Sequence, residues 1–266
     1  MRIRIGALFG LSLAALAAIG PVTAADMTAP AYKAAPVPVF SWSGLYVGGT
    51  VGGGMASLPV TQLDDFIGNT LPGQTLKSLG AAGGLHAGYN WQFAPSFLFG
   101  IEGDFNWSSL KASDSTCFAD CIDDERVTTS SKLGQFSTFR ARFGLTSDRT
   151  LVYVTAGPAW GHINASMTDF NCTAAVCFNP GAPNAIASDS SFRIGVALGG
   201  GVEYALTANW ILRGEYLHLD FSNKDTVLKD PTTGIPFIGF DGISNFRVRS
   251  SATADIARLG VSYKFW

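Results

Sequence analysis

The stretch Phe97-Leu-Phe-Gly-Ile-Glu-Gly-Asp-Phe-Asn-Trp107 alternates between large apolar side chains and polar ones. One parity carries Phe97, Phe99, Ile101, Phe105 and Trp107, and the other carries Glu102, Asp104 and Asn106. Successive side chains of a β-strand point to opposite faces of the sheet. The stretch therefore predicts a strand with one apolar face and one charged face.

Eight stretches have this strand character: Gly44–Met55, Leu79–Gln92, Phe97–Leu110, Leu133–Thr146, Leu151–Asn164, Phe192–Leu206, Trp210–Phe221 and Ala254–Phe265. Five of them carry two charges on one parity: Glu102 and Asp104, Arg140 and Arg142, Arg193 and Glu203, Arg213 and Glu215, Arg258 and Lys264. An Arg or Lys facing lipid near mid-membrane costs roughly 2–4 kcal/mol. The pattern predicts lipid on the apolar side and a lumen on the charged side. Asp255 departs from it unless this residue lies at the outer rim.

The gaps between these stretches alternate in length. Phe93–Ser96, Ser147–Thr150 and Thr207–Asn209 are turn-sized, and each of the other four gaps holds roughly 20–30 mostly polar residues, which is unusual in a compact soluble domain. Outer-membrane barrels combine an even strand number, short periplasmic turns and long extracellular loops. We therefore predict an all-β fold, an eight-stranded antiparallel up-and-down transmembrane β-barrel. The alternative is a soluble β-sandwich.

Composition narrows the possibilities further. Of 266 residues only 14% are charged, 47% are hydrophobic, and the formal net charge is −2. Soluble domains carry about 25% charged residues. The apolar content argues against a disordered chain, and the absence of a basic excess argues against nucleic-acid binding. The abundance of Gly and Phe favours strands over helices.

The first residues have the features of an export signal. Arg2 and Arg4 precede an apolar run from Ile5 to Ile19, and small residues lead to a cleavage site after Ala24. The run is short for a transmembrane helix, which is the competing interpretation. We expect a signal peptide at 1–24, a Pro/Ala-rich periplasmic linker at 25–42 and the barrel domain at 43–266. Export and barrel together predict the outer membrane of a Gram-negative bacterium.

Short motifs, one per expected strand, carry a resemblance. They are Trp42-Ser-Gly-Leu-Tyr-Val-Gly48, Ala87-Gly-Tyr-Asn-Trp-Gln92, Gly100-Ile-Glu-Gly-Asp104, Phe139-Arg-Ala-Arg-Phe-Gly144, Tyr153-Val-Thr-Ala-Gly157, Phe192-Arg-Ile-Gly195, Arg213-Gly-Glu-Tyr216 and Arg258-Leu-Gly-Val-Ser-Tyr-Lys-Phe265. In this order they resemble the small alphaproteobacterial outer-membrane β-barrel proteins, a porin family of OmpA-like surface antigens. The loops carry no resemblance.

The resemblance implies two partners. Members usually end in Tyr-Lys-Phe, an aromatic terminus associated with the barrel-assembly machinery. This chain keeps the alternating Val261, Tyr263 and Phe265 and adds Trp266. A mature N-terminus of the Ala-Asp type is an attachment point to peptidoglycan in related proteins, so Ala25, followed by Asp26, is the candidate attachment site here.

Little in the sequence points to chemistry. The cysteines favour local disulfides, Cys117–Cys121 and Cys172–Cys177, although four thiols allow three connectivities. We expect no cofactor, and the acidic pairs at Asp64-Asp65 and Asp123-Asp124 are interpreted as solvated rather than metal-binding. His218, with Asp220 and Ser222, is the nearest approach to a hydrolytic set, and we interpret it as a polar rim. The protein is not expected to be an enzyme.

The charges on lumen parity suggest the function. They are Glu102, Asp104, Arg140, Arg142, Arg193, Glu203, Arg213, Glu215 and Arg258. An eight-stranded barrel leaves room only for side chains, and buried charges need partners. We therefore predict an ion-paired plug in a structural barrel that supports the envelope and presents its loops outside. Outer-membrane lipid and lipopolysaccharide are the expected surroundings. The alternative is a small diffusion porin for ions or small solutes.

Overall fold

The computed structural model describes residues 40–64, 69–70, 74–117, 126–170, 186–230, 233–236 and 246–265. These ranges contain eight long antiparallel strands and one strand of two residues. They are β1 (Gly44–Asp64), β2 (Asn69–Thr70), β3 (Gln74–Ala94), β4 (Phe97–Cys117), β5 (Arg126–Ser147), β6 (Thr150–Phe170), β7 (Ile186–Ala205), β8 (Trp210–Val227) and β9 (Phe246–Lys264). No helix in these ranges is long and apolar enough to cross a membrane. The expected signal peptide and most of the expected linker lie outside them.

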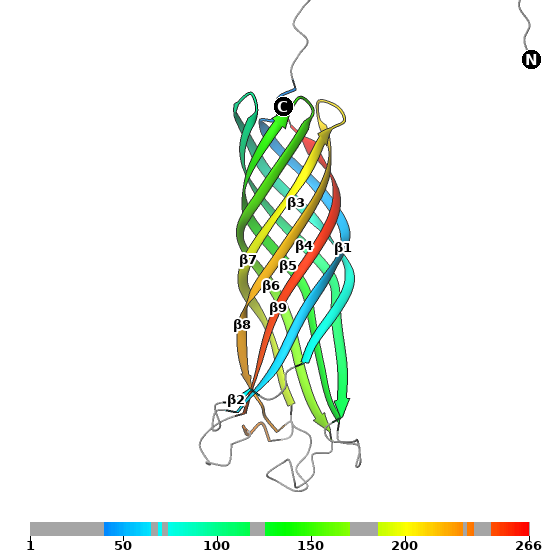
Figure 1. Ribbon diagram of the computed structural model, residues 1–266, viewed down its shortest axis with the longest axis vertical. Helices are drawn as coiled ribbons and strands as arrows, with labels where there is room; N and C mark the ends of the chain where they lie inside the picture. Colours follow the sequence, from blue (N-terminus) through cyan, green and yellow to red (C-terminus); the bar gives the residue numbers. More distant parts are fainter. Residues whose placement is uncertain are drawn as a thin grey trace, which may run out of the picture. The chain divides into compact units, whose positions relative to one another are not determined.

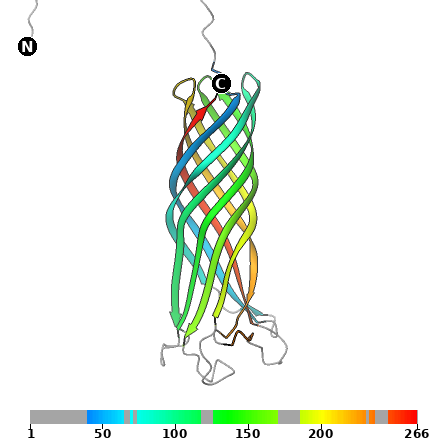
Figure 2. The ribbon, with the colours of Figure 1, turned by 180° about the vertical axis from the view of Figure 1, so that it is seen from behind.

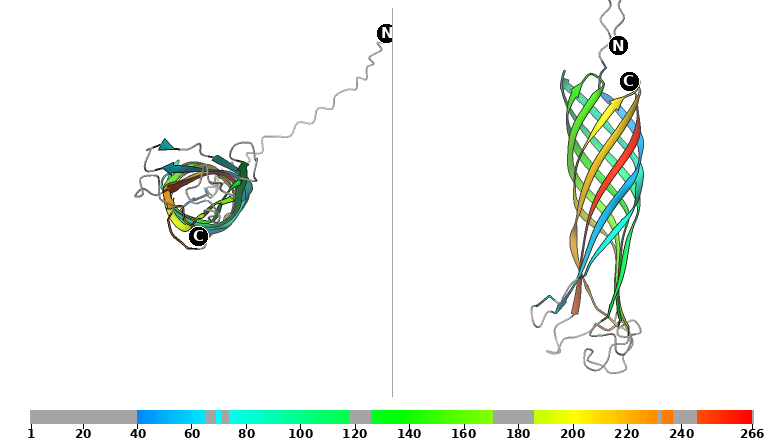
Figure 3. Two further views of the ribbon diagram at one scale, coloured as in Figure 1. Left: turned by 90° about the horizontal axis from the view of Figure 1, so that it is seen from below. Right: turned by 45° about the vertical axis from the view of Figure 1, so that its right-hand side comes forward.

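The eight long strands form a closed cylinder. Each pairs with the next along the chain, and β1 closes the sheet by pairing antiparallel with β9 from Tyr46↔Lys264 to Asp64↔Phe246. The two strands lie side by side in Figure 1, green strands form the opposite wall in Figure 2, and the end-on view in Figure 3 shows a ring. The predicted eight-stranded barrel is confirmed. Its short β2 pairs only with the end of β1.

Tight turns connect the strands at one end of the cylinder. The turn between β3 and β4 consists of Pro95 and Ser96. The turn between β5 and β6 consists of Asp148 and Arg149. Asp148 has a φ of 50°, which a two-residue hairpin turn requires and which Asp tolerates better than most residues. At this end the strand limits lie within two residues of the predicted ones.

At the other end the strands are longer than the sequence pattern predicts. The first strand is expected to end at Met55 and ends at Asp64, and the last is expected to begin at Ala254 and begins at Phe246. All eight strands are extended in this way. The barrel therefore continues well beyond the alternating segments, and part of each polar gap is strand.

The alternation separates the two faces as expected. Leu259 is 66% exposed on the outer wall, whereas its neighbour Arg258 is 4% exposed inside. Large apolar residues cover the outer wall in a band that begins at the tight turns, with Trp91, Trp210 and Tyr263 near those turns and Trp107 and Trp160 toward the other end. Two aromatic girdles around an apolar band are typical of the two membrane interfaces. In barrels of this kind the short turns lie on the periplasmic side, and we label the two ends accordingly.

Candidate functional site

Arg140 lies at the centre of the lumen and contacts three carboxylates. Its Nη2 donates to Glu102 at 2.7 Å and to Asp104 at 2.9 Å, and its Nη1 donates to Glu215 at 2.8 Å. The acidic residues lie on β4 and β8, on either side of the lumen, and β5 supplies the arginine. All four side chains are fully enclosed. One guanidinium therefore ties two sides of the cylinder together.

Three further arginines extend this contact into one network. Arg258 binds Asp104 at 2.9 Å and Glu215 at 2.5 Å. Arg213 and Arg142 both contact Glu102 and Glu203; the two contacts with Glu203 measure 2.8 and 2.5 Å. Four carboxylates and four guanidiniums thus neutralise one another within the membrane band. Buried charges are tolerated only when they are paired and hydrogen-bonded in this manner.

Two tyrosines that the charge pattern of the sequence does not reveal complete the network. Tyr46 donates its hydroxyl to Glu102 at 2.7 Å and accepts from Arg142 at 2.5 Å. Arg142 also lies 4.0 Å from the ring centroid of Tyr153, a cation–π contact. The available signal was position: both tyrosines share lumen parity within the expected strands Gly44–Met55 and Leu151–Asn164, which carry no charged residue.

Apolar layers lie on both sides of the ionic network. The inward residues of β8 show the sequence of layers from the periplasmic end: Ile211, then Arg213 and Glu215, then Leu217, Leu219 and Phe221. The periplasmic layer contains Trp42, Leu98, Leu151, Tyr153, Ala205 and Ile211. The larger layer beyond the network includes Leu58, Leu110, Leu133, Phe136, Leu217 and Phe221. Trp42, assigned by sequence to the linker, is therefore packed inside the barrel mouth.

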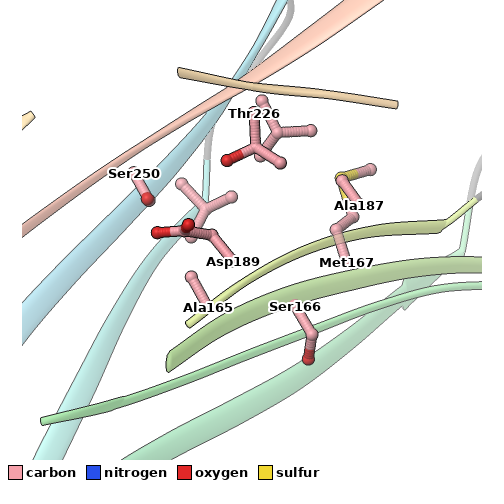
Figure 4. Close-up of a pocket in the computed structure, with 9 residues that line it drawn as sticks. Ala165, Ser166, Met167, Ala187, Asp189, Thr226 and Ser250 are labelled. Carbon is pink, nitrogen blue, oxygen red and sulfur yellow. The ribbon is translucent and has the colours of Figure 1, made fainter. Parts of the chain in front are cut away.

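Arg193 is separate from the network, although the sequence groups it with the other lumen charges. It donates to Asp189 at 3.1 Å and to the backbone and hydroxyl oxygens of Ser250 at 2.9 and 2.7 Å. Above it a third apolar cluster, Val60, Met167, Ala187 and Val248, lies in the extracellular part of the lumen. Figure 4 shows the pocket there, whose volume is only about 10 Å³. That space is close to the size of one water molecule.

The candidate hydrolytic set is not assembled as the sequence suggested. His218 contacts Asp255 on β9, with Nδ1 2.7 Å from Oδ1, and Tyr216 donates to the same oxygen at 2.5 Å. These side chains lie on the outer wall of the barrel. Asp255 therefore faces outward, against the alternation, and its carboxylate is hydrogen-bonded to Tyr216 and His218. Within the described ranges no three His, Cys, Asp or Glu residues gather as a metal site.

The other predicted sites lie at the limits of the described chain. Val261 and Tyr263 face outward on β9, and the ring of Tyr263 lies 5.2 Å from that of Phe265. Trp266, Ala25 and Asp26 lie outside the described residues, as do Cys121, Cys172 and Cys177. Cys117 is the last residue of β4. The disulfides, the assembly signal and the peptidoglycan attachment stay predictions.

A closed eight-stranded cylinder with a lipid-facing band and a charged interior is the architecture of a bacterial outer-membrane β-barrel protein. Over residues 12–265 the chain matches the outer membrane protein beta-barrel domain family. It belongs to that family, which confirms the resemblance noted in the sequence and places the protein in the outer membrane.

Relatives of known sequence agree with this family. The chain is 32% identical over 251 residues to the 31 kDa outer-membrane immunogenic protein of Brucella melitensis. This alignment covers 92% of this chain and 91% of the relative. It is 28% identical over 192 residues to a 22 kDa outer membrane protein of Rhizobium leguminosarum, with 72% and 70% covered. The outer membrane protease OmpT of Escherichia coli aligns with a TM-score of 0.46 and 10% identity, covering 83% of this chain and 97% of OmpT.

Proposed function

We propose that this protein is a structural barrel whose lumen does not conduct, and that it supports the outer membrane and presents its loops at the cell surface. The observation that carries the proposal is the buried network of Glu102, Arg140, Glu215 and their partners, which joins opposite walls of the cylinder. An ion that crossed this level would have to displace paired charges. No described feature favours an open conduit.

Support comes also from the apolar layers. Hydrophobic constrictions exclude water and close channels by dewetting. The periplasmic layer around Trp42 and the larger layer around Phe136 lie on either side of the charges, so water that reached the network would first have to cross a layer without hydrogen-bond partners. A diffusion porin, the alternative function, needs a continuous polar path through the same cross-sections.

Single-channel recording tests the proposal directly. The full mature protein is incorporated into planar lipid bilayers, and its folding is established by the change in gel mobility on heating. We expect no stable conductance steps from folded protein in molar salt. Reproducible steps of one size, present with folded protein and absent with a heat-denatured sample, would establish the porin function instead.

The role in the envelope is tested in cells. The relatives are named outer-membrane immunogenic proteins, which supports exposure of part of those barrels to a host. A strain that lacks this chain is expected to take up more detergent and large antibiotics than the parent. Full restoration by wild-type protein supports the role, whereas an unchanged barrier in the deletion strain contradicts it.

The partners expected from the termini belong to the same proposal. The outward Val261 and Tyr263 supply the alternating face that the barrel-assembly machinery recognises, and Ala25 supplies the amine for attachment to peptidoglycan. Intact-mass analysis of the N-terminal peptide after muramidase digestion decides the second point. An Ala25 amine without modification in all molecules would end that part of the proposal.

A further inference from the structure

Beyond the apolar band, one row of polar side chains crosses four neighbouring strands on the outer wall. Cross-strand pairing places Lys111 of β4 beside Lys132 of β5, Lys132 beside Asn164 of β6, and Asn164 beside Ser190 of β7. The next row toward the extracellular end consists of four serines, Ser113, Ser130, Ser166 and Ser188, in the same register. The two rows form a continuous surface of ammonium, amide and hydroxyl groups, which we call the lysine–serine patch.

The two lysines are an unusual pair. Like charges directly opposite each other on neighbouring strands destabilise a sheet. Both are exposed, and the described part of the chain offers neither of them an acidic partner. Two other extracellular cations do have partners: Lys224 binds Asp189 at 3.0 Å and Arg249 binds Asp225 at 2.7 Å. The barrel itself thus leaves two adjacent positive charges without compensation.

The patch surrounds a shallow cavity of about 320 Å³. Lys111, Lys132, Asn164 and serines of both rows line it, and Asp189 contributes the one carboxylate. That carboxylate is already engaged by Arg193 of the same strand, β7, and by Lys224 of β8. The cavity therefore presents a positive wall and several hydroxyl groups to the outside.

The position of the patch in the membrane indicates what it meets. Trp107 precedes Lys111 by four residues on β4, and Trp160 precedes Asn164 by four on β6; both indoles belong to the outer aromatic girdle. Four residues of a strand tilted as in such barrels rise roughly 10 Å along the axis. The patch therefore lies at the level of the headgroups of the outer leaflet.

We propose that the lysine–serine patch binds the anionic sugar headgroup of an outer-leaflet glycolipid. Phosphate or carboxylate groups of the headgroup would lie between the ammonium groups of Lys111 and Lys132, which relieves their mutual repulsion. The hydroxyl and amide groups of Asn164, Ser166 and Ser190 match the donors and acceptors of a sugar. The acyl chains would extend from there along the apolar band. This binding does not depend on whether the lumen conducts.

Native mass spectrometry of the full mature protein in detergent micelles tests the site. Lipid A, a phosphorylated diglucosamine lipid, is added to wild type, to Lys111→Gln/Lys132→Gln and to Arg249→Gln as the control that removes an exposed, ion-paired cation. A surface lysine contributes about a fivefold gain in affinity for an anionic lipid surface. We expect the double variant to bind lipid A about 30-fold more weakly and Arg249→Gln to bind as wild type does.

Further arms identify the source of the anion and exclude misfolding. Lys111→Arg/Lys132→Arg keeps the charges and is expected to retain binding, and heat-dependent gel mobility shows that each variant is folded. Millimolar inorganic phosphate should not displace lipid A from wild type. Three outcomes would each overturn the proposal. They are wild-type affinity of Lys111→Gln/Lys132→Gln for lipid A, displacement of lipid A by free phosphate, and binding of phosphatidylglycerol, which has no sugar, as tightly as lipid A.

Discussion

Arg140 illustrates at the scale of one residue what the lumen requires of its side chains. Its guanidinium supplies hydrogen bonds to three carboxylates from two strands, a number that the forked, always charged arginine side chain can provide. Removing one partner of a buried ionic group leaves charges without compensation, and the cost commonly reaches about 3–5 kcal/mol. Loss of Arg140 is therefore expected to destabilise the barrel more than loss of a surface ion pair.

We expect Arg140→Met to lower the free energy of unfolding by about 3–5 kcal/mol, because three buried carboxylates share too few cations. Urea unfolding in phospholipid vesicles, followed by tryptophan fluorescence, measures the change. Arg249→Gln is the control: it breaks an exposed ion pair with Asp225 and should shift the unfolding curve much less. An Arg140→Met barrel with the wild-type midpoint would show that the network contributes no stability.

Glycine matters where two strands approach closely inside the narrow cylinder. A Cβ atom on the inward-facing Gly84 would lie 2.1 Å from the carbonyl oxygen of Phe105, whereas a Cβ on the outward-facing Gly103 would lie 3.8 Å from the Phe139 side chain. We expect Gly84→Ala to destabilise the barrel by about 1–3 kcal/mol through forced backbone shifts, and Gly103→Ala to have a small effect. The same urea titration compares the two. Equal midpoints would mean that the strands adjust freely at Gly84.

The residues of the site were partly predictable. Side-chain parity alone assigned eight charges to what proves to be one connected network, because each is too costly to place in lipid. Parity gives the face of a residue but not its height, so Arg193 was grouped with residues that lie deeper in the lumen. The role of Tyr46 was not predicted, because tyrosine occurs both at lipid interfaces and in polar interiors and its type therefore does not indicate its face.

At the scale of the strand, the sequence predicted one end far better than the other. Breaks such as Pro95-Ser96 and Asp148-Arg149 mark the periplasmic turns sharply, and the alternation begins directly beside them. Toward the extracellular end the outer face becomes polar, as at Lys111, Lys132 and the serine rows. The inner face there mixes apolar residues such as Val60 and Met167 with small polar ones such as Ser131, so the contrast between parities is lost while the backbone pairing continues. Hydrogen bonding there depends on the neighbouring strand, which a single stretch of sequence does not reveal.

The two parts of one strand should respond differently to a charge on the outer face. Val51 of β1 is 69% exposed within the apolar band, and Ser57 lies on the same face six residues nearer the extracellular end. We expect Val51→Arg to cost roughly 2–4 kcal/mol in vesicles and Ser57→Arg to cost far less, since only the first places a cation in lipid. Measurement of both unfolding free energies in vesicles decides this. Similar losses for the two variants would contradict the assignment of the band.

At the scale of the whole molecule, buried side chains occupy the lumen at several successive levels. An apolar layer around Trp42, the ionic network, the larger apolar layer and the cluster around Val60 follow one another along the axis. In the proposed closure, the apolar layers exclude water and the ionic network holds its charges in pairs. Under the proposed closure we expect one level alone to block ions, so that stability and closure are separable properties of the barrel.

This separation leads to a prediction for Phe221, the largest side chain that β8 contributes to the larger apolar layer. Phe221→Ala leaves a cavity and should lower stability by about 3–5 kcal/mol. It should nevertheless produce no conductance, because Arg140 and its partners still span the lumen below the cavity. Urea unfolding in vesicles gives the first quantity, and planar-bilayer recording of folded protein gives the second. Stable conductance steps from this single variant would show that the ionic network is permeable and that the apolar layer alone closes the barrel.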